Sequence, residues 1–477
     1  MGFRATAATG GRVKILLVED EDRSARQTSS IIRRISNSCE ISVARCRDDA
    51  IAEIEQRSFD LVICDLRIPP NNESADVDES HGLAVHGRAR ELAPGTPLAF
   101  LTAFATPKNT KDHLSGGGLE NVFGIANFRL VQLIEKDDLM GLEQYLETLL
   151  GACESLQSSC TVTGSELDEP MFDRAVRVYA ASTGHSRVVV EASSGLSGAA
   201  VGRVRLESDI QASAKVLIKL DSHSNSADES ERYNKYVANR LQPGHFAPAL
   251  PPMRAGLRKK SALVLTLADD RYMTLFEFLR QTPGCAAEVV ARLRQALQPW
   301  SEVTNTIPVD LRDLRQSRIS DAELISNGFD ANDFGRREAR SISMRQGIVH
   351  GDLHGGNVLV DSDRRPMIVD YGDVGVDYTA VDPVTLELSL IYNRQGPARA
   401  AEFHSSIRWD LWPDVEACYD SSPFRSFAAA CRQWALESDS EEAVMAFAYA
   451  HSVRQLKYGD VPKEVASAVA DASVSAL

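Results

Sequence analysis

The sequence predicts two folded regions of different class, a doubly wound parallel α/β sheet over residues 13–150 and an α+β region over most of the remaining chain. The first region alternates strand-like and helix-like runs, which is typical of a parallel sheet covered by helices on both faces. The second region begins with apolar strand-like runs and ends in long stretches with helix-like apolar spacing. A length of 477 residues allows two or three domains, each with its own core.

Composition and charge exclude several classes of protein. The apolar content of 43% and charged content of 25% are ordinary for a globular chain, and the net charge of −15 argues against a binder of nucleic acid or anionic membranes. The longest apolar runs, such as residues 262–268, are too short to span a membrane, and the N-terminus lacks a signal-peptide pattern. The eight cysteines are scattered without a CxxC pair. We therefore expect free thiols and a cytoplasmic protein.

In the first region we expect strands at 13–18, 41–44, 60–64, 97–101 and 129–134, with helices at 23–36 and 48–56. Polar residues follow four of these strands, namely Glu19 with Asp20, Asp65, Thr102 and Lys136. The carboxyl ends of parallel strands meet at one edge of the sheet. Three carboxylates at this edge would repel one another unless a cation lay among them, and oxygen ligands suit Mg²⁺.

This set resembles the receiver domain of two-component response regulators, which has a flavodoxin-like, five-stranded sheet. The resemblance implies that Asp65 accepts a phosphoryl group, that Glu19, Asp20 and Asp65 hold Mg²⁺, and that Thr102 and Lys136 bind the phosphoryl group. It also implies an upstream histidine kinase or other phosphodonor and allows a homodimer through the receiver. Asp137 stands where receivers usually carry Pro, and Leu133 where an aromatic residue is common. The alternative is a flavodoxin-like sheet whose charged strand ends are only solvated.

The second region contains the motif HGDLHGGN at residues 350–357, followed by IVD at 368–370. Asp352 can lie beside an attacking hydroxyl, while Asn357 and Asp370 can ligate Mg²⁺ on a nucleotide. The apolar runs between these two ligands predict a hairpin of two short strands that brings them together. The alternatives are a surface loop rich in His and Gly, or a metal site built on His350 and His354.

HGDLHGGNVLV followed by IVDYGD resembles the catalytic and metal-binding loops of the aminoglycoside phosphotransferase and choline kinase branch of the protein-kinase-like fold. The resemblance implies a bilobal α+β domain that uses ATP and Mg²⁺, with Asp352 as catalytic base and Asn357 and Asp370 as metal ligands. Asp382 is expected either to brace the catalytic loop or to cap a helix. The predicted domains are a tail at 1–12, the receiver at 13–150, a linker or connecting helix at 151–168, an N-lobe at 169–282 and a C-lobe at 283–477.

Upstream of this motif, a glycine-rich turn with Gly195, Gly198 and Gly202 separates two strands, and such a turn lets backbone N–H groups approach phosphates. A flexible hairpin is the alternative interpretation. The next strand, 214–219, ends at Lys219, which matches the phosphate-anchoring lysine of kinases. The following helix places Glu229 on its apolar face, where it would pair with Lys219, and Glu231 is the second candidate.

These features together predict an ATP-dependent phosphotransferase whose acceptor is a hydroxyl, regulated by phosphorylation of the receiver. HGD in place of HRD favours a small-molecule acceptor over a protein. Three alternatives stay open: a protein Ser/Thr kinase, a nucleotide-binding pseudoenzyme in a larger signalling or defence complex, and a response regulator whose output is protein binding.

Overall fold

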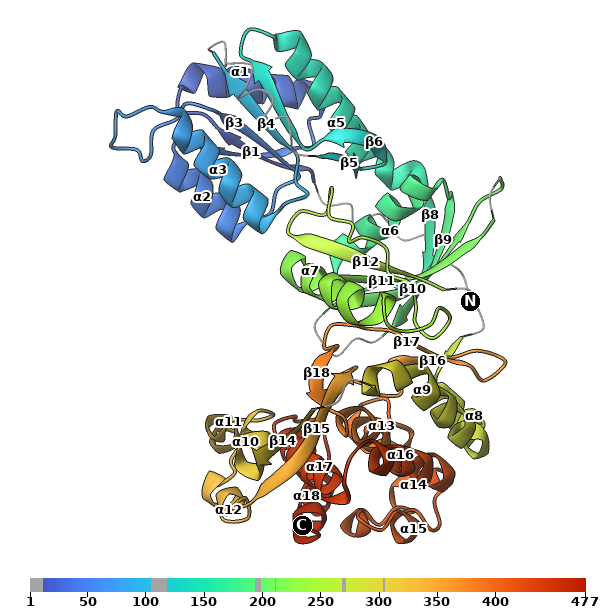
Figure 1. Ribbon diagram of the computed structural model, residues 1–477. Helices are drawn as coiled ribbons and strands as arrows, with labels where there is room; N and C mark the ends of the chain where they lie inside the picture. Colours follow the sequence, from blue (N-terminus) through green and yellow to red (C-terminus); the bar gives the residue numbers. More distant parts are fainter. Residues whose placement is uncertain (1–11, 104–117, 194–198, 211, 268–271, 303–304) are drawn as a thin grey trace. The chain divides into compact units, whose positions relative to one another are not determined.

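The computed structural model describes residues 12–103, 118–193, 199–210, 212–267, 272–302 and 305–477 (Figure 1). The chain divides into two compact units, one formed by residues 1–228 with 249–268 and the other by residues 229–248 with 269–477. This division differs from the predicted domains, because the first unit contains both the receiver and most of the predicted N-lobe.

The predicted receiver contains a five-stranded parallel sheet in the order β2-β1-β3-β4-β7, which confirms the predicted doubly wound α/β fold. Its strands are β1 (Lys14–Val18), β2 (Glu40–Ala44), β3 (Leu61–Asp65), β4 (Leu98–Thr102) and β7 (Val131–Glu135). The last strand begins later than the predicted residue 129. Arg129 instead ends an antiparallel hairpin formed by β5 (Leu119–Val122) and β6 (Ile125–Arg129).

Helices cover both faces of this sheet (Figure 1). One apolar cluster includes side chains of α1 (Asp22–Ile35) and α5 (Leu139–Ser159), and a second includes side chains of α2 (Arg47–Gln56) and α3 (Glu79–Leu92). Ile32 and Leu146 are buried on the first face, and Ile54 and Val85 on the second. The polar residues of the three inner strands, β1, β3 and β4, accordingly lie where these strands begin or end.

The predicted linker, 151–168, is largely regular structure. Helix α5 continues to Ser159, and β8 (Thr161–Gly164) then joins a second sheet. This sheet has the order β12-β11-β10-β9-β8 and contains β9 (Arg187–Ser193), β10 (Ala200–Glu207), β11 (Ala214–Ser222) and β12 (Lys260–Thr266). Helix α6 (Pro170–Thr183) packs on it through an apolar cluster that includes Phe172 and Val176. Helix α7 (His223–Arg232) follows β11.

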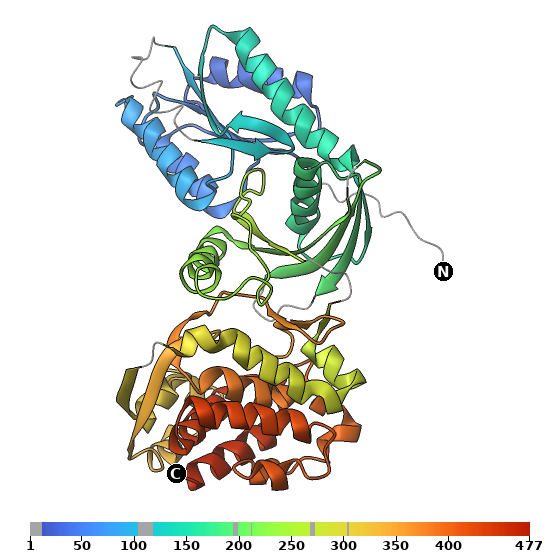
Figure 2. The same ribbon diagram turned by 45° about the vertical axis from the view of Figure 1, so that its right-hand side comes forward.

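The second unit combines two small sheets with a helical body (Figure 2). One sheet pairs β13 (Met273–Thr274), β16 (Val358–Val360) and β17 (Pro366–Ile368), and the other pairs β14 (Asn305–Asp310), β15 (Ser341–Val349) and β18 (Gly375–Tyr378). The predicted hairpin at 358–368 is thus confirmed.

The helices of this unit are α8 (Leu275–Gln281), α9 (Ala286–Ser301), α13 (Val381–Tyr392), α14 (Ala401–His404), α15 (Val415–Cys418), α16 (Arg425–Ser438), α17 (Glu441–Gln455) and α18 (Lys463–Ser475). A π-helical turn at Tyr233–Ala238 opens the unit. Helix α16 packs on α9 and α13, and α17 packs on α18. None of the helices in the described part of the chain combines the length and apolarity needed to cross a membrane.

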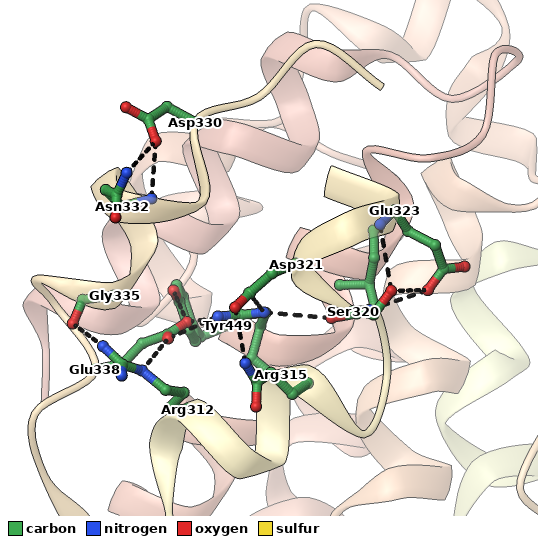
Figure 3. Close-up of polar contacts among 12 residues, drawn as sticks. Arg312, Arg315, Ser320, Asp321, Glu323, Asp330, Asn332, Gly335, Glu338 and Tyr449 are labelled. Atoms are coloured by element: carbon green, nitrogen blue, oxygen red, sulfur yellow. Dashed lines mark hydrogen bonds and ion pairs between the residues drawn. The ribbon is translucent and has the colours of Figure 1, made fainter. Parts of the chain in front are cut away.

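The charged segment between β14 and β15 is folded around a buried ion pair (Figure 3). It contains α10 (Leu311–Gln316), α11 (Asp321–Ser326) and α12 (Ala331–Gly335). Arg315 donates to both carboxylate oxygens of Glu338, at 2.9 and 3.0 Å, and the Tyr449 hydroxyl donates to the same carboxylate at 2.7 Å. These buried charges are mutually satisfied, which allows so polar a segment to pack on the helical body.

Candidate functional sites

The structure brings together the five residues predicted at the carboxyl edge of the receiver sheet. Glu19 and Asp20 follow β1, and one oxygen of each lies within 4.8 Å of the other and of an Asp65 oxygen. The Lys136 ammonium lies 2.7 Å from Asp65 Oδ2 and 2.8 Å from Glu19 Oε2. Thr102 is the last residue of β4, and its carbonyl accepts the Lys136 N–H at 2.8 Å.

Burial controls the charges at this edge. It raises the pKa of both Glu19 and Asp65, although the hydrogen bonds from Lys136 work in the opposite direction. Burial would lower the pKa of Lys136, but its hydrogen bonds with Asp65 and Glu19 outweigh it and raise that pKa. The three carboxylates form an oxygen donor set that fits Mg²⁺, and Asp20 is exposed to solvent.

In the second unit, the loop at 350–357 follows β15 and is held by Asp382. The Asp382 carboxylate accepts the backbone N–H groups of His350 at 2.8 Å and Gly351 at 3.1 Å. Asp382 lies inside the first turn of α13, whose N-cap is Ala380, so the bracing interpretation is confirmed and the capping interpretation is wrong. Gly351 has φ +82°, and an added Cβ would lie 2.5 Å from the Asp373 carbonyl oxygen, so the loop requires glycine there.

Asp352 presents its carboxylate to solvent from this fixed loop. Its side chain is 52% exposed, while its carbonyl accepts the Asn357 side-chain amide at 2.9 Å. His354 Nε2 lies 3.8 Å from Asp352 Oδ2, and burial lowers the pKa of His354. The His354 ring stacks on Phe276, with centroids 6.1 Å apart. The carboxylate is therefore accessible while its backbone is fixed.

The hairpin brings the two predicted metal ligands of this unit together. Asn357 immediately precedes β16, and Asp370 lies two residues after β17. The Val369 N–H donates to the Asn357 carbonyl at 3.0 Å, which continues the ladder towards Asp370. The Asn357 amide nitrogen is engaged with Asp352, so its oxygen remains to act as a ligand. An amide oxygen next to a carboxylate fits Mg²⁺.

Lys219 and Glu229 lie in different units. Lys219 is buried in β11, opposite Leu263 of β12. Glu229 is 3% exposed and accepts the backbone N–H of Tyr371 at 3.0 Å, whereas Glu231 is exposed. The structure thus confirms the inward orientation of Glu229, and its pairing with Lys219 stays a prediction.

The glycine-rich turn is shorter than expected. Gly202 lies inside β10 rather than in the turn, and an added Cβ would approach the Phe172 ring to 2.9 Å. This close packing is sufficient reason for a glycine at that position. Gly195 and Gly198 lie outside the described residues, so the phosphate-binding role of all three glycines stays a prediction.

One ion pair near the metal-binding loop was not predicted from the sequence. Arg318, from the charged segment, lies 2.6 Å from Asp377 in β18, the strand that follows the loop at 370–373. The Arg318 guanidinium carbon also lies 5.3 Å from the centroid of the buried Phe447 ring. The partners are 59 residues apart, so no local spacing could indicate the pair.

Both sites lie in segments that match known protein families. Residues 15–123 match the response regulator receiver domain, and residues 270–417 match the phosphotransferase enzyme family. The first match contains Glu19, Asp20, Asp65 and Thr102, and the second contains the whole motif from His350 to Asp370. The chain therefore joins a receiver domain to a domain of the phosphotransferase enzyme family.

Individual relatives cover parts of the chain. The transcriptional regulatory protein ZraR of Salmonella typhimurium is 28% identical over 127 residues, which is 26% of either protein, so the chain spans about a quarter of the length of that relative. A CheY-like receiver from Methanospirillum hungatei is 21% identical, covers 29% of this chain and 98% of its own, and gives a TM-score of 0.21. Plasmodium vivax ethanolamine kinase is 10% identical, covers 65% of this chain and 89% of its own, and gives a TM-score of 0.34. Neither structural similarity bears on what this chain binds.

Proposed function

We propose that this protein is an ATP- and Mg²⁺-dependent phosphotransferase that transfers the γ-phosphoryl group to a hydroxyl and is regulated by its receiver. The arrangement of Asp352 is the observation that supports this proposal most strongly. Its carboxylate is exposed to solvent, while Asp382 and Asn357 fix the backbone on either side of it. An accessible carboxylate on a fixed loop suits a base that must hold a substrate hydroxyl in line for transfer.

In this mechanism Asp352 orients the acceptor hydroxyl and receives its proton. Asn357 and Asp370 would hold Mg²⁺. When bound, this ion would neutralise negative charge on the phosphates. Lys219, with the glycine-rich turn that contains Gly195 and Gly198, is proposed to bind the phosphates. Positioning and electrostatic stabilisation then provide most of the rate enhancement.

We further propose that Asp65 receives a phosphoryl group from a histidine kinase or another phosphodonor. The contact of 2.7 Å between the Lys136 ammonium and Asp65 supports a role for Lys136 in binding a phosphoryl oxygen, and Thr102, the last residue of β4, is proposed to bind one as well. Glu19 and Asp20 would complete the Mg²⁺ site that this transfer requires.

The acceptor is proposed to be a small molecule, because the loop reads HGD rather than HRD. A protein Ser/Thr kinase is the second candidate, supported by the same base and metal ligands. Peptide arrays and metabolite mixtures, each incubated with labelled ATP and Mg²⁺, distinguish the two.

The test of the proposed function is turnover of labelled ATP by the wild type, Asp352→Ala and Asp370→Ala. We expect turnover in the wild type, its loss in Asp352→Ala with nucleotide binding retained, and loss of Mg²⁺-dependent nucleotide binding in Asp370→Ala. Binding without turnover in the wild type, over a broad set of acceptors, would instead identify a nucleotide-binding pseudoenzyme.

A further inference from the structure

A second buried charge cluster lies at the opposite edge of the receiver sheet from Asp65. Asp60 immediately precedes β3 and is 2% exposed. Its carboxylate accepts hydrogen bonds from Arg258 Nε at 2.8 Å and Arg258 Nη2 at 2.7 Å, and another from Arg174 Nη1. The backbone N–H of Lys14 donates to it at 2.8 Å. Both arginines belong to the second-sheet half of the same compact unit, which is built on the sheet β12-β11-β10-β9-β8: Arg174 lies in α6 and Arg258 in the loop before β12.

Asp60 is held as an anion. Burial alone would raise its pKa, but the hydrogen bond with Arg258 and the charges of Arg174 and Arg258 outweigh burial and lower that pKa. Removing one partner of a buried carboxylate that lies between two guanidinium groups costs far more folding free energy than breaking an exposed ion pair does. The cluster therefore favours one fixed arrangement of the receiver on the second-sheet half.

Backbone and apolar contacts surround this cluster. The Gly256 N–H donates to the Gly95 carbonyl at 3.1 Å, and a Cβ added to Gly95 would lie 2.0 Å from the Arg254 carbonyl oxygen. Arg254 also lies 2.7 Å from Glu120 in β5, and a Cβ at Gly256 would meet the Phe123 ring at 2.8 Å. The apolar core of the receiver includes Ala255 and Val178 of the second-sheet half. We call these contacts the docking joint. It connects Asp60, Gly95 and the β5–β6 hairpin on one side with α6 and residues 253–259 on the other.

Two rigid elements connect the docking joint to the two sites. On the receiver side, the β5–β6 hairpin leads directly into β7, and Lys136 follows that strand with its ammonium on Asp65. On the other side, residues 253–259 lead into β12, which pairs with β11 so that Leu263 lies opposite Lys219. Each connecting strand of five to seven residues spans only about 17–23 Å.

We propose that the docking joint is a permanent interface within the chain and that it transmits the state of Asp65 to the strand that carries Lys219. Movement of Lys136 towards a phosphoryl group pulls on β7 and the hairpin, and the hairpin shifts residues 253–259 and thereby β12 and β11. The charge at Asp60 keeps the two halves in register while this happens. The transmission rests on the proposed function of the receiver, whereas the interface itself does not.

The test uses the full-length chain and beryllofluoride, a phosphoryl mimic, with Mg²⁺. We expect beryllofluoride to change amide hydrogen exchange at residues 253–266 and 214–222, and to change the affinity for a non-hydrolysable ATP analogue at least threefold. Asp60→Asn should bind beryllofluoride and the analogue but lose this response. Arg254→Gln, at the rim of the joint, should behave in the same way and serves as the test variant if Asp60→Asn does not fold. Glu143→Gln, which breaks the ion pair with Arg34 away from the joint, should respond like the wild type.

The controls separate the two proposals. Asp65→Ala must abolish the response, which shows that beryllofluoride acts at the receiver and not at the nucleotide site. A wild type that binds no nucleotide but shows the change in hydrogen exchange would refute the phosphotransferase proposal and support the joint. A folded Asp60→Asn or Arg254→Gln variant with the wild-type response would overturn the proposal for the joint. A wild type with unchanged exchange at residues 253–266 would also overturn it.

Discussion

Replacing Asp382 by Asn should separate stability from activity in the phosphotransferase domain. Burial raises the pKa of Asp382 to about 6, although the charge of His350 and the N–H donors of His350 and Gly351 lower it. The difference from the ordinary value of 3.8 corresponds to about 3 kcal/mol. Because the folded state holds the proton more tightly than the unfolded state, the free energy of unfolding falls as the pH rises from about 4 to about 6 and is level above that range.

Asn cannot ionise, so Asp382→Asn should escape this loss. Relative to the wild type, its free energy of unfolding should rise with pH, by about 2 kcal/mol between pH 4.5 and 7.5. Urea unfolding followed by tryptophan fluorescence measures this difference selectively, because the four tryptophans, Trp300, Trp409, Trp412 and Trp434, all lie in the second unit. An Asp310→Asn control, at an exposed carboxylate of the same unit, should follow the wild-type pH dependence.

Activity should change in the opposite direction. Asn offers one acceptor oxygen where Asp382 satisfies two N–H groups, so the backbone next to Asp352 is less firmly held. A displacement of about 1 Å in a reacting group lowers a rate by roughly 100-fold, so turnover should fall by that order at pH 7.5. If the stability of Asp382→Asn instead declines relative to the wild type as the pH rises, the ionised carboxylate stabilises the fold and the reasoning is refuted.

Three further predictions concern other parts of the chain. Gly351→Ala should lower turnover at least tenfold and destabilise the second unit by about 1–3 kcal/mol in urea unfolding, because of its positive φ, whereas Gly459→Ala, with open space around it, should change neither. Glu387→Gln should reduce the free energy of unfolding by about 3–5 kcal/mol, because it leaves the Arg432 guanidinium buried without its carboxylate; an intact urea midpoint would contradict this. Lys136→Met removes the cation between two buried carboxylates, so Mg²⁺ should raise its melting temperature more than that of the wild type in differential scanning fluorimetry.

The sequence predicts those features that depend on local pattern. Alternating apolar runs predict the parallel sheet, and the side chains at its strand ends, such as Asp65 and Lys136, meet because parallel strands share an edge. The spacing within one hairpin likewise predicts that Asn357 and Asp370 come together. Each of these inferences uses residues whose relative position follows from one strand, turn or sheet edge.

Contacts between distant segments could not be predicted in the same way. Asp60 meets Arg174 and Arg258 across 114 and 198 residues, and a charged residue at a strand start looks the same in sequence whether it is solvated or buried. The sequence predicts Gly202 in a phosphate-binding turn, but β10 begins earlier, and the absence of a side chain at Gly202 leaves room for the ring of Phe172 from α6. Packing between elements determines both the burial of Asp60 and the need for glycine at position 202, and such packing leaves no periodic pattern in the sequence.

The central claim is that a receiver controls phosphoryl transfer within one chain. The most direct test measures Mg²⁺-dependent turnover of labelled ATP before and after treatment with acetyl phosphate, in the wild type, Asp65→Ala and Asp352→Asn. We expect a change of at least threefold in the wild type, no change in Asp65→Ala at unaltered basal turnover, and no turnover in Asp352→Asn. Turnover that persists in Asp352→Asn, or a response that persists in Asp65→Ala, would contradict it.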